Sequence, residues 1–112
     1  MKKIELQLTA TQLNTLVYSF GLLEKIYPKT RREKVMKSIL VELAIKLQKK
    51  HIEVKAFSKT LFSKPKKPKF TFKYYEADAL ENFLLLAENE PLNEYDRNCV
   101  RFLIHKLNQQ LA

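Results

Sequence analysis

Cysteine and histidine are the side chains of this sequence best suited to nucleophilic, acid–base or metal chemistry. Cys99 is the only cysteine, and the two histidines are His51 and His105. Cys99 and His105 lie in one helical pattern about 240° apart around the axis, so that helix cannot bring them into one site. A site built from several thiolates is excluded, and Gly21, the only glycine, cannot form a glycine-rich phosphate loop. We therefore expect a protein that is not an enzyme and that uses no metal or cofactor.

Lysine and phenylalanine are interleaved through the centre of the chain, a combination suited to nucleic acid. The net charge of +9 divides into +5 for residues 1–48, +8 for residues 49–73 and −4 for residues 74–112. Lysines contact phosphates and aromatic rings stack on bases, so the central segment is one candidate site for single strands. The alternative is a lysine-rich surface that only keeps the protein soluble. The residues concerned are Lys55, Lys59, Lys64, Lys66, Lys67, Lys69 and Lys73, with Phe57, Phe62, Phe70 and Phe72.

The overall composition is that of an ordinary globular protein. Hydrophobic residues make up 46% and charged residues 29% of the 112 residues, a length that suits one domain. The N-terminal residues alternate apolar with polar side chains instead of forming a signal sequence, and no apolar run approaches the roughly 18 residues of a membrane span. We expect a cytoplasmic protein with no membrane segment, and a single cysteine requires no oxidising compartment.

The elements that would position these side chains follow from the spacing of apolar residues. Residues 4–8 alternate apolar with polar side chains, which is typical of a half-buried strand. In residues 11–26 the apolar side chains fall three or four apart, which predicts one helix capped by Thr9 or Thr11. Gly21 lies inside this pattern, and we favour a role in close helix packing over a break in the helix.

A second helix is expected to begin at Thr30, because Thr30 and Glu33 have the spacing of a capping box. Its apolar stripe comprises Val35, Met36, Ile39, Leu40, Leu43, Ala44 and Leu47. Beyond Gln48 the pattern permits either a longer helix or an extra edge strand through Ile52, Val54 and Ala56. The prolines Pro65 and Pro68 then predict an extended, exposed connector.

The same order of elements then recurs. Residues 69–75 alternate as a second strand, residues 80–87 have helical spacing, and Asn93 can cap a last helix whose stripe runs from Cys99 to Leu111. Ile4 aligns with Phe70 and Leu6 with Phe72, a match of pattern with little residue identity. Chance order in an α+β chain is the alternative to duplication.

We therefore predict one α+β domain, mostly helical, over residues 1–112. It would consist of unit one at 1–50, a basic linker at 51–68 and unit two at 69–112, with each unit a strand followed by two helices. Because a lone strand leaves its backbone groups unpaired, the two strands should pair as an antiparallel ribbon packed on four helices.

Residues 2–50 resemble a ribbon-helix-helix protein, through the strand-helix-helix order and the basic residues that face away from the core. In that family two units pair their strands, insert the ribbon into the DNA major groove, and hold a phosphate at the start of the second helix. The resemblance implies a single-chain pseudo-dimer that binds DNA as a regulator. The acidic residues Glu94 and Asp96 do not fit this resemblance, because they lie at the start of the second helix of unit two, where the family holds a phosphate. The expected contacts to DNA or RNA are Lys3, Gln7, Thr30, Arg31, Arg32, Lys64, Lys66, Lys67, Lys69, Thr71 and Lys73.

A second class of function is a protein-interaction or assembly module, including a homodimer. Apolar residues outside the main stripes widen the helical faces, which indicates either helices buried between neighbours or a self-association surface. These residues are Val41, Ile45, Leu85, Leu86 and Phe102.

Overall fold

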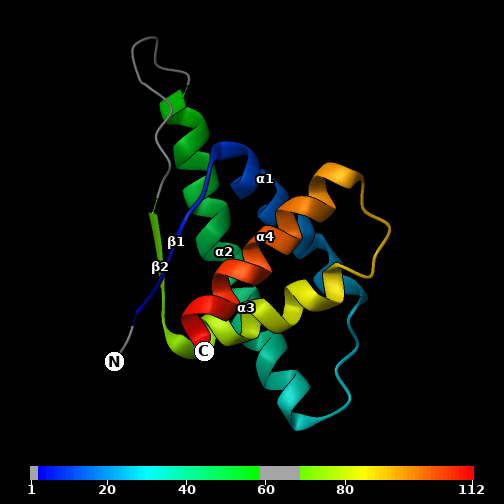
Figure 1. Cartoon of the computed structure of the whole chain (residues 1–112). Coiled ribbons are helices and arrows are strands. Elements are labelled where there is room, and N and C mark those ends of the chain that lie inside the picture. Colours follow the sequence, from blue (N-terminus) through cyan, green and yellow to red (C-terminus); the bar gives the residue numbers. More distant parts are fainter. Residues whose placement is uncertain (1–2, 59–68) are drawn as a thin grey trace.

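The computed structural model describes the backbone of residues 3–58 and 69–112, and the side chains of residues 3–53 and 69–112. Within these ranges the chain forms a two-stranded antiparallel sheet and four α-helices, so the predicted mostly helical α+β class is confirmed (Figure 1). In chain order the elements are β1 (Ile4–Gln7), α1 (Ala10–Ser19), the 3₁₀ helix η1 (Phe20–Lys25), α2 (Arg31–Ser58), β2 (Lys69–Phe72), α3 (Tyr74–Ala87) and α4 (Glu94–Leu111).

Strands β1 and β2 form the ribbon. Ile4 pairs with Phe72 and Leu6 pairs with Phe70, and these four side chains are buried against the helices. The residues between them face solvent, because successive side chains of a strand point to opposite faces. The alternation read from the sequence therefore predicted correctly which face of each strand is buried.

The second strand is shorter than its sequence pattern predicted. Tyr74 and Tyr75 lie in the first turn of α3, and Lys73 is the N-cap residue of that helix. The Lys73 backbone N–H donates to the Glu76 carboxylate at 2.8 Å, an interaction that satisfies one of the unpaired amides at a helix start. This cap starts the helix before the tyrosines can continue the strand.

The first helix also differs from its prediction, because only its first half is α-helical. Thr9 is the cap: its hydroxyl accepts from the Gln12 N–H at 3.1 Å, and the Gln12 side chain accepts from the Thr9 N–H at 2.9 Å. From Phe20 the chain tightens into η1, and Gly21 lies just after this change. Apart from its chain neighbours and the backbone of its own helical turns, no described atom lies within 4 Å of the place where a Gly21 side chain would begin, so the close-packing interpretation of Gly21 was wrong. Gly21 marks the break instead.

Helix α2 is the longest element, with 28 residues. Its N-terminus has the predicted capping box, in which the Thr30 hydroxyl accepts from the Glu33 N–H at 3.1 Å. The helix continues to Ser58, so residues 51–58 are helical and do not form an edge strand. Val35, which was expected in the apolar stripe, is exposed.

The helices pack around one apolar core beneath the ribbon. Helix α1 contacts α2 and α4, while α3 contacts α4 and α2. Phe20 of η1 stacks on Phe83 of α3 with ring centroids 5.3 Å apart. Each fully buried leucine in this core contributes about 1.5–3 kcal/mol relative to an exposed one. Such leucines are Leu8, Leu13, Leu16, Leu40, Leu43, Leu47, Leu80, Leu84, Leu103 and Leu107.

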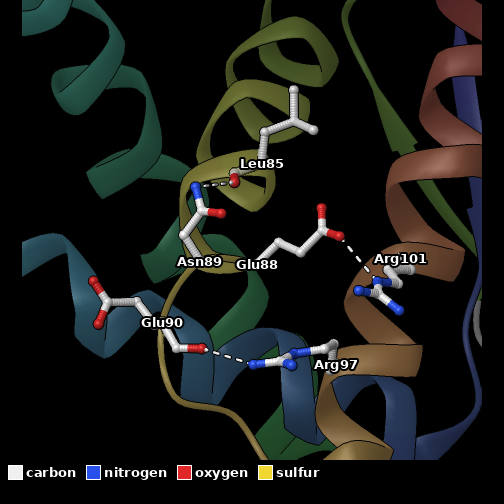
Figure 2. Close-up of polar contacts among 6 residues, drawn as sticks. All are labelled: Leu85, Glu88, Asn89, Glu90, Arg97 and Arg101. Carbon is white, nitrogen blue, oxygen red and sulfur yellow. Dashed lines mark hydrogen bonds and ion pairs between the residues drawn. The ribbon is translucent and has the colours of Figure 1, made fainter.

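Polar contacts at the connection between α3 and α4 fix the direction of α4 (Figure 2). Arg101 of α4 forms a 2.9 Å ion pair with Glu88 at the end of α3. Arg97 donates to the Glu90 carbonyl oxygen at 3.5 Å. The predicted cap is also present, since the Asn93 side chain accepts from the Asp96 N–H at 2.7 Å. The N-terminal end of α4 is therefore anchored to the preceding helix.

Candidate nucleic-acid interface

The solvent face of the ribbon carries three of the residues predicted to contact nucleic acid. Gln7, Lys69 and Thr71 are exposed on adjacent strands, as is Glu5 between them. Lys69 forms a 3.0 Å ion pair with Glu5 across the strands, which cancels one positive charge.

Lys3 and Lys73 stand at one end of the ribbon. They directly flank the paired residues Ile4 and Phe72, and both side chains are exposed. Lys73 Nζ lies 5.9 Å from the centre of the Tyr75 ring, but no acid pairs with either lysine in the described part of the chain. This end of the ribbon is therefore positively charged.

The C-terminal half of α2 adds positive charge beside β2. Lys46 Nζ lies 3.5 Å from the Thr71 carbonyl oxygen and 5.9 Å from the centre of the Phe72 ring. Lys49 and Lys50 follow on the next turn and are exposed, with Lys50 3.8 Å from Glu53. Lys46 was missed at the sequence level, although its place between Leu43 and Leu47 puts it at the flank of the apolar stripe, where a lysine can reach a neighbouring strand.

Thr30, Arg31 and Arg32 lie elsewhere. They are exposed at the start of α2, at the bottom of Figure 1, whereas the ribbon lies at the left beside the other half of that helix. The Glu33 carboxylate accepts from the backbone N–H groups of Lys29 at 2.7 Å and Thr30 at 3.4 Å. These two hydrogen bonds hold the pKa of Glu33 below its ordinary value. A carboxylate thus already occupies amides that a bound phosphate would use, and the structure does not bring this helix start to the ribbon.

The start of α4, the corresponding place in unit two, is also distant from the ribbon in Figure 1. Asp96 accepts a 3.1 Å hydrogen bond from the buried Thr15 hydroxyl of α1, so its carboxylate joins α4 to α1. Lys64, Lys66 and Lys67 lie outside the described residues, and their role stays a prediction.

A hollow of about 550 Å³ lies between the ribbon and α4. One wall carries Glu5, Gln7 and Lys69 of the ribbon, and the other carries Phe102 and Lys106 of α4. Lys106 Nζ lies 5.7 Å from the centre of the Phe102 ring. Sequence reasoning assigned Phe102 to an assembly surface and did not single out Lys106, because nothing local in the sequence connects α4 with the ribbon.

The C-terminal turn of α4 is attached to β1. The Gln110 side chain accepts from the Glu5 N–H at 2.9 Å and donates to the Glu5 carbonyl oxygen at 2.7 Å, as a neighbouring strand would. The Tyr74 hydroxyl donates to the Leu111 carbonyl oxygen at 3.0 Å. Because α4 is anchored at both ends, Phe102 and Lys106 are held facing the ribbon.

The cysteine and histidine considered first do not share a site. Cys99 is buried and His105 is exposed. Burial raises the pKa of the Cys99 thiol, with a smaller contribution from the nearby Asp96 carboxylate, whereas a hydrogen bond with Thr15 opposes the rise. Among residues 3–53 and 69–112, no three His, Cys, Asp or Glu side chains gather as a metal site requires. None of the described helices combines the length and the apolar character needed to cross a membrane.

Comparison with known proteins gives no match to a family model, to a curated protein or to a solved structure. The resemblance to ribbon-helix-helix proteins therefore stands at a coarser level, that of a small α+β chain with an antiparallel strand pair and four α-helices in its described part.

Proposed function

We propose that this chain is a non-enzymatic nucleic-acid-binding protein that contacts DNA or RNA through a basic surface. We define the basic surface as Lys3, Lys69 and Lys73 of the ribbon region with Lys46, Lys49 and Lys50 of α2. The observation that carries the proposal is the position of Lys46 against β2, which joins the lysines of α2 to those of the ribbon.

The balance of charge supports this surface. Its acidic neighbours Glu5 and Glu53 each lie against a lysine side chain, and the Glu76 carboxylate accepts from the Lys73 backbone N–H, so these acids reduce the positive charge of the six lysines without reversing it. The undescribed residues 59–68 between α2 and β2 add four lysines and no acid to the sequence. Clustered lysines attract phosphates and release their counterions, which gives binding that depends strongly on salt.

The arrangement of the ribbon supports the finer proposal of a duplicated, regulator-like protein. The proposed repeat aligns Ile4 with Phe70 and Leu6 with Phe72. If each residue is replaced by its aligned equivalent, the cross-strand pair Ile4–Phe72 becomes the other observed pair, Phe70–Leu6. Such an exchange is what a two-fold axis through the ribbon produces. A two-stranded ribbon fits the major groove of duplex DNA, where Gln7 and Thr71 would face base edges. We also propose a cytoplasmic location, as expected from the sequence.

The test compares two charge reversals of equal size. The variant Lys46→Glu/Lys49→Glu/Lys73→Glu alters the basic surface, and Arg31→Glu/Arg32→Glu/Lys34→Glu alters the start of α2. Fluorescence anisotropy with labelled duplexes and single strands of DNA and RNA across a salt series gives Kd and its salt dependence. We expect the first variant to weaken binding at least about tenfold and to flatten the salt slope by about 2–3, since each phosphate contact contributes about 0.7–0.9. The second variant should change Kd by less than about threefold.

Two results would contradict the proposal. One is no binding of wild-type protein to any of the four nucleic acids at about 50 mM salt, where phosphate contacts are strongest. The other is an equal loss in both variants, which would mean that only total charge matters. A loss confined to the second variant would instead restore the phosphate site predicted at Thr30, Arg31 and Arg32.

A specific observation also favours self-association as a second function. Val41, Ile45 and Ile52 lie on the face of α2 opposite its buried leucines and are 44%, 51% and 66% exposed. Leu85, Leu86 and Phe102 are also exposed, so neighbours in the described part of the chain do not bury these faces. Light scattering should show a homodimer that persists at high salt, because apolar contact is not screened, and that dissociates with Ile45→Lys. A monomer at all concentrations would contradict this second function.

A further inference from the structure

The hollow between the ribbon and α4 brings together the groups that an unpaired nucleotide requires. Phe102 presents a partly exposed aromatic ring, and two basic residues, Lys69 and Lys106, also line this space. Gln7 adds a carboxamide that can both donate and accept hydrogen bonds. We propose that this hollow receives one unpaired nucleotide of a single-stranded DNA or RNA, with the base against Phe102 and its phosphate near Lys106 and Lys69. This inference rests on the proposed function and specifies its substrate.

The size and rigidity of the hollow fit this role. Its volume of about 550 Å³ falls in the range of about 300–1,000 Å³ that is usual for small-ligand sites. Its ribbon wall is fixed by the two hydrogen bonds between Gln110 and the Glu5 backbone. The Gln12 side chain at its rim is held by the Thr9 N–H. Walls fixed before binding reduce the ordering that a nucleotide would otherwise have to induce.

The charges of the hollow favour a phosphate beside the base. The Glu5 carboxylate is already paired with Lys69 at 3.0 Å, so Lys106 supplies the uncompensated positive charge. Lys106 Nζ lies close to the Phe102 ring, at 5.7 Å from its centre, which places a cation next to a stacking surface. In a nucleotide the sugar likewise holds the phosphate a short distance from the base. Aromatic stacking combined with phosphate neutralisation is the general basis of single-strand binding.

A base that is paired within a duplex is not expected to enter the hollow. A base inside a duplex is paired and stacked, and it must be extruded before it can enter a side pocket. The base of a single strand needs no such step. The hollow is therefore expected to raise the affinity for single strands while leaving the affinity for duplexes to the basic surface.

The test uses Phe102→Ala and Lys106→Gln in the full chain. The matched controls are Tyr27→Ala and Lys34→Gln, which remove an exposed ring and an exposed charge outside the hollow. Anisotropy is measured with a labelled single strand of about 12 nucleotides, a length within the usual range for one binding unit, and with the corresponding duplex. Circular dichroism confirms that each variant is folded, and Phe102→Trp serves as the variant that retains a stacking surface.

We expect Phe102→Ala to weaken single-strand binding at least about fivefold, the lower limit of a lost stacking contact. Lys106→Gln should also weaken it, while Phe102→Trp and both controls should stay within about twofold of wild type. Duplex binding should be unaffected by Phe102→Ala. If the wild type binds and the basic-surface variant does not, but Phe102→Ala binds single strands like Tyr27→Ala, this inference is overturned and the proposed function stands. If the wild type binds no nucleic acid, both are overturned.

Discussion

Replacing Gln110 by alanine tests whether α4 holds β1 as the structure indicates. The Gln110 carboxamide forms two hydrogen bonds with the backbone of Glu5, at 2.9 and 2.7 Å. Alanine removes both, and it leaves the outer edge of β1 without this partner. The helix itself should tolerate the change, because alanine is the best helix former.

The expected magnitude follows from these two contacts. A hydrogen bond contributes about 0.5–1.5 kcal/mol net, so two contribute about 1–3 kcal/mol. Glu5 is exposed, and water can replace part of the lost interaction, which favours the lower half of that range. Alanine returns a few tenths of a kcal/mol through helix propensity. We expect Gln110→Ala to lower the free energy of unfolding by about 1 kcal/mol.

Urea unfolding followed by circular dichroism gives this difference, with Gln109→Ala as the control because Gln109 is the exposed neighbour in the same helix. The Glu5 amide should also exchange its hydrogen faster in Gln110→Ala than in the control. Gln110→Glu keeps the shape but removes the N–H donor, so it should destabilise at neutral pH at least as much as alanine. Equal stabilities of Gln110→Ala and Gln109→Ala, within about 0.3 kcal/mol, would refute this account of β1.

Three further predictions concern the core, the start of α2 and the thiol. Phe83→Ala should cost about 3–5 kcal/mol in the free energy of unfolding, because Phe83 is fully buried and stacks on Phe20; a loss below about 1 kcal/mol in denaturant unfolding would contradict this packing. The pKa of Glu33 is lowered by its backbone hydrogen bonds, so its stabilisation of the start of α2 is complete above its ordinary pKa of about 4.3 and is lost as pH falls through the lower folded value. The Thr30 amide shift in NMR should follow that titration in the wild type and stay constant in Glu33→Gln, and a midpoint at or above 4.3 would argue against it. Alkylation of Cys99 by iodoacetamide should be at least about 100-fold slower in the folded than in the urea-unfolded protein, since the thiol is buried and its pKa is raised; equal rates would show that it is accessible.

The ribbon could be predicted from the sequence because its pattern is strict. Ile4 and Leu6 alternate with polar residues, as do Phe70 and Phe72, and a shift of one residue would expose all four. The apolar residues therefore show which face of each strand is buried. Because the backbone groups of a strand must pair, the two strands are also expected to pair with each other. Antiparallel pairing of β1 with β2 is what the structure shows.

The details that could not be predicted lie where the spacing of apolar residues is compatible with more than one secondary structure. Phe20, Leu23 and Ile26 are each three residues apart, which suits a 3₁₀ helix of three residues per turn, but within a longer α-helical pattern the same spacing also predicts an α-helix. Tyr74 and Tyr75 continue the alternation of β2, yet the Glu76 side chain caps the start of α3 and overrides it. At the start of α3, one local contact thus outweighs the apolar period.

One part of the candidate site could be predicted from the sequence and another part could not. The exposed lysines of the ribbon follow from strand alternation, and the structure places Lys3, Lys69 and Lys73 as expected. The hollow depends on how α4 crosses the ribbon, because Phe102 and Lys106 come from a helix distant in sequence. Packing angles between distant elements are not encoded in a local pattern, so the hollow could be found only in the folded chain.

The long separation between the paired strands has a consequence for synthesis. When residues 1–58 have left the ribosome, β1 has no strand to pair with, and Ile4 and Leu6 lack the cover that Phe70, Phe72 and the later helices provide. An unpaired strand edge of this kind can join the same strand of a neighbouring nascent chain. Translation of β2 and α4 ends this exposure, since β2 occupies one edge of β1 and Gln110 the other. A ribosome that stalls before β2 would therefore release a fragment prone to strand exchange, whereas the completed chain closes both edges itself.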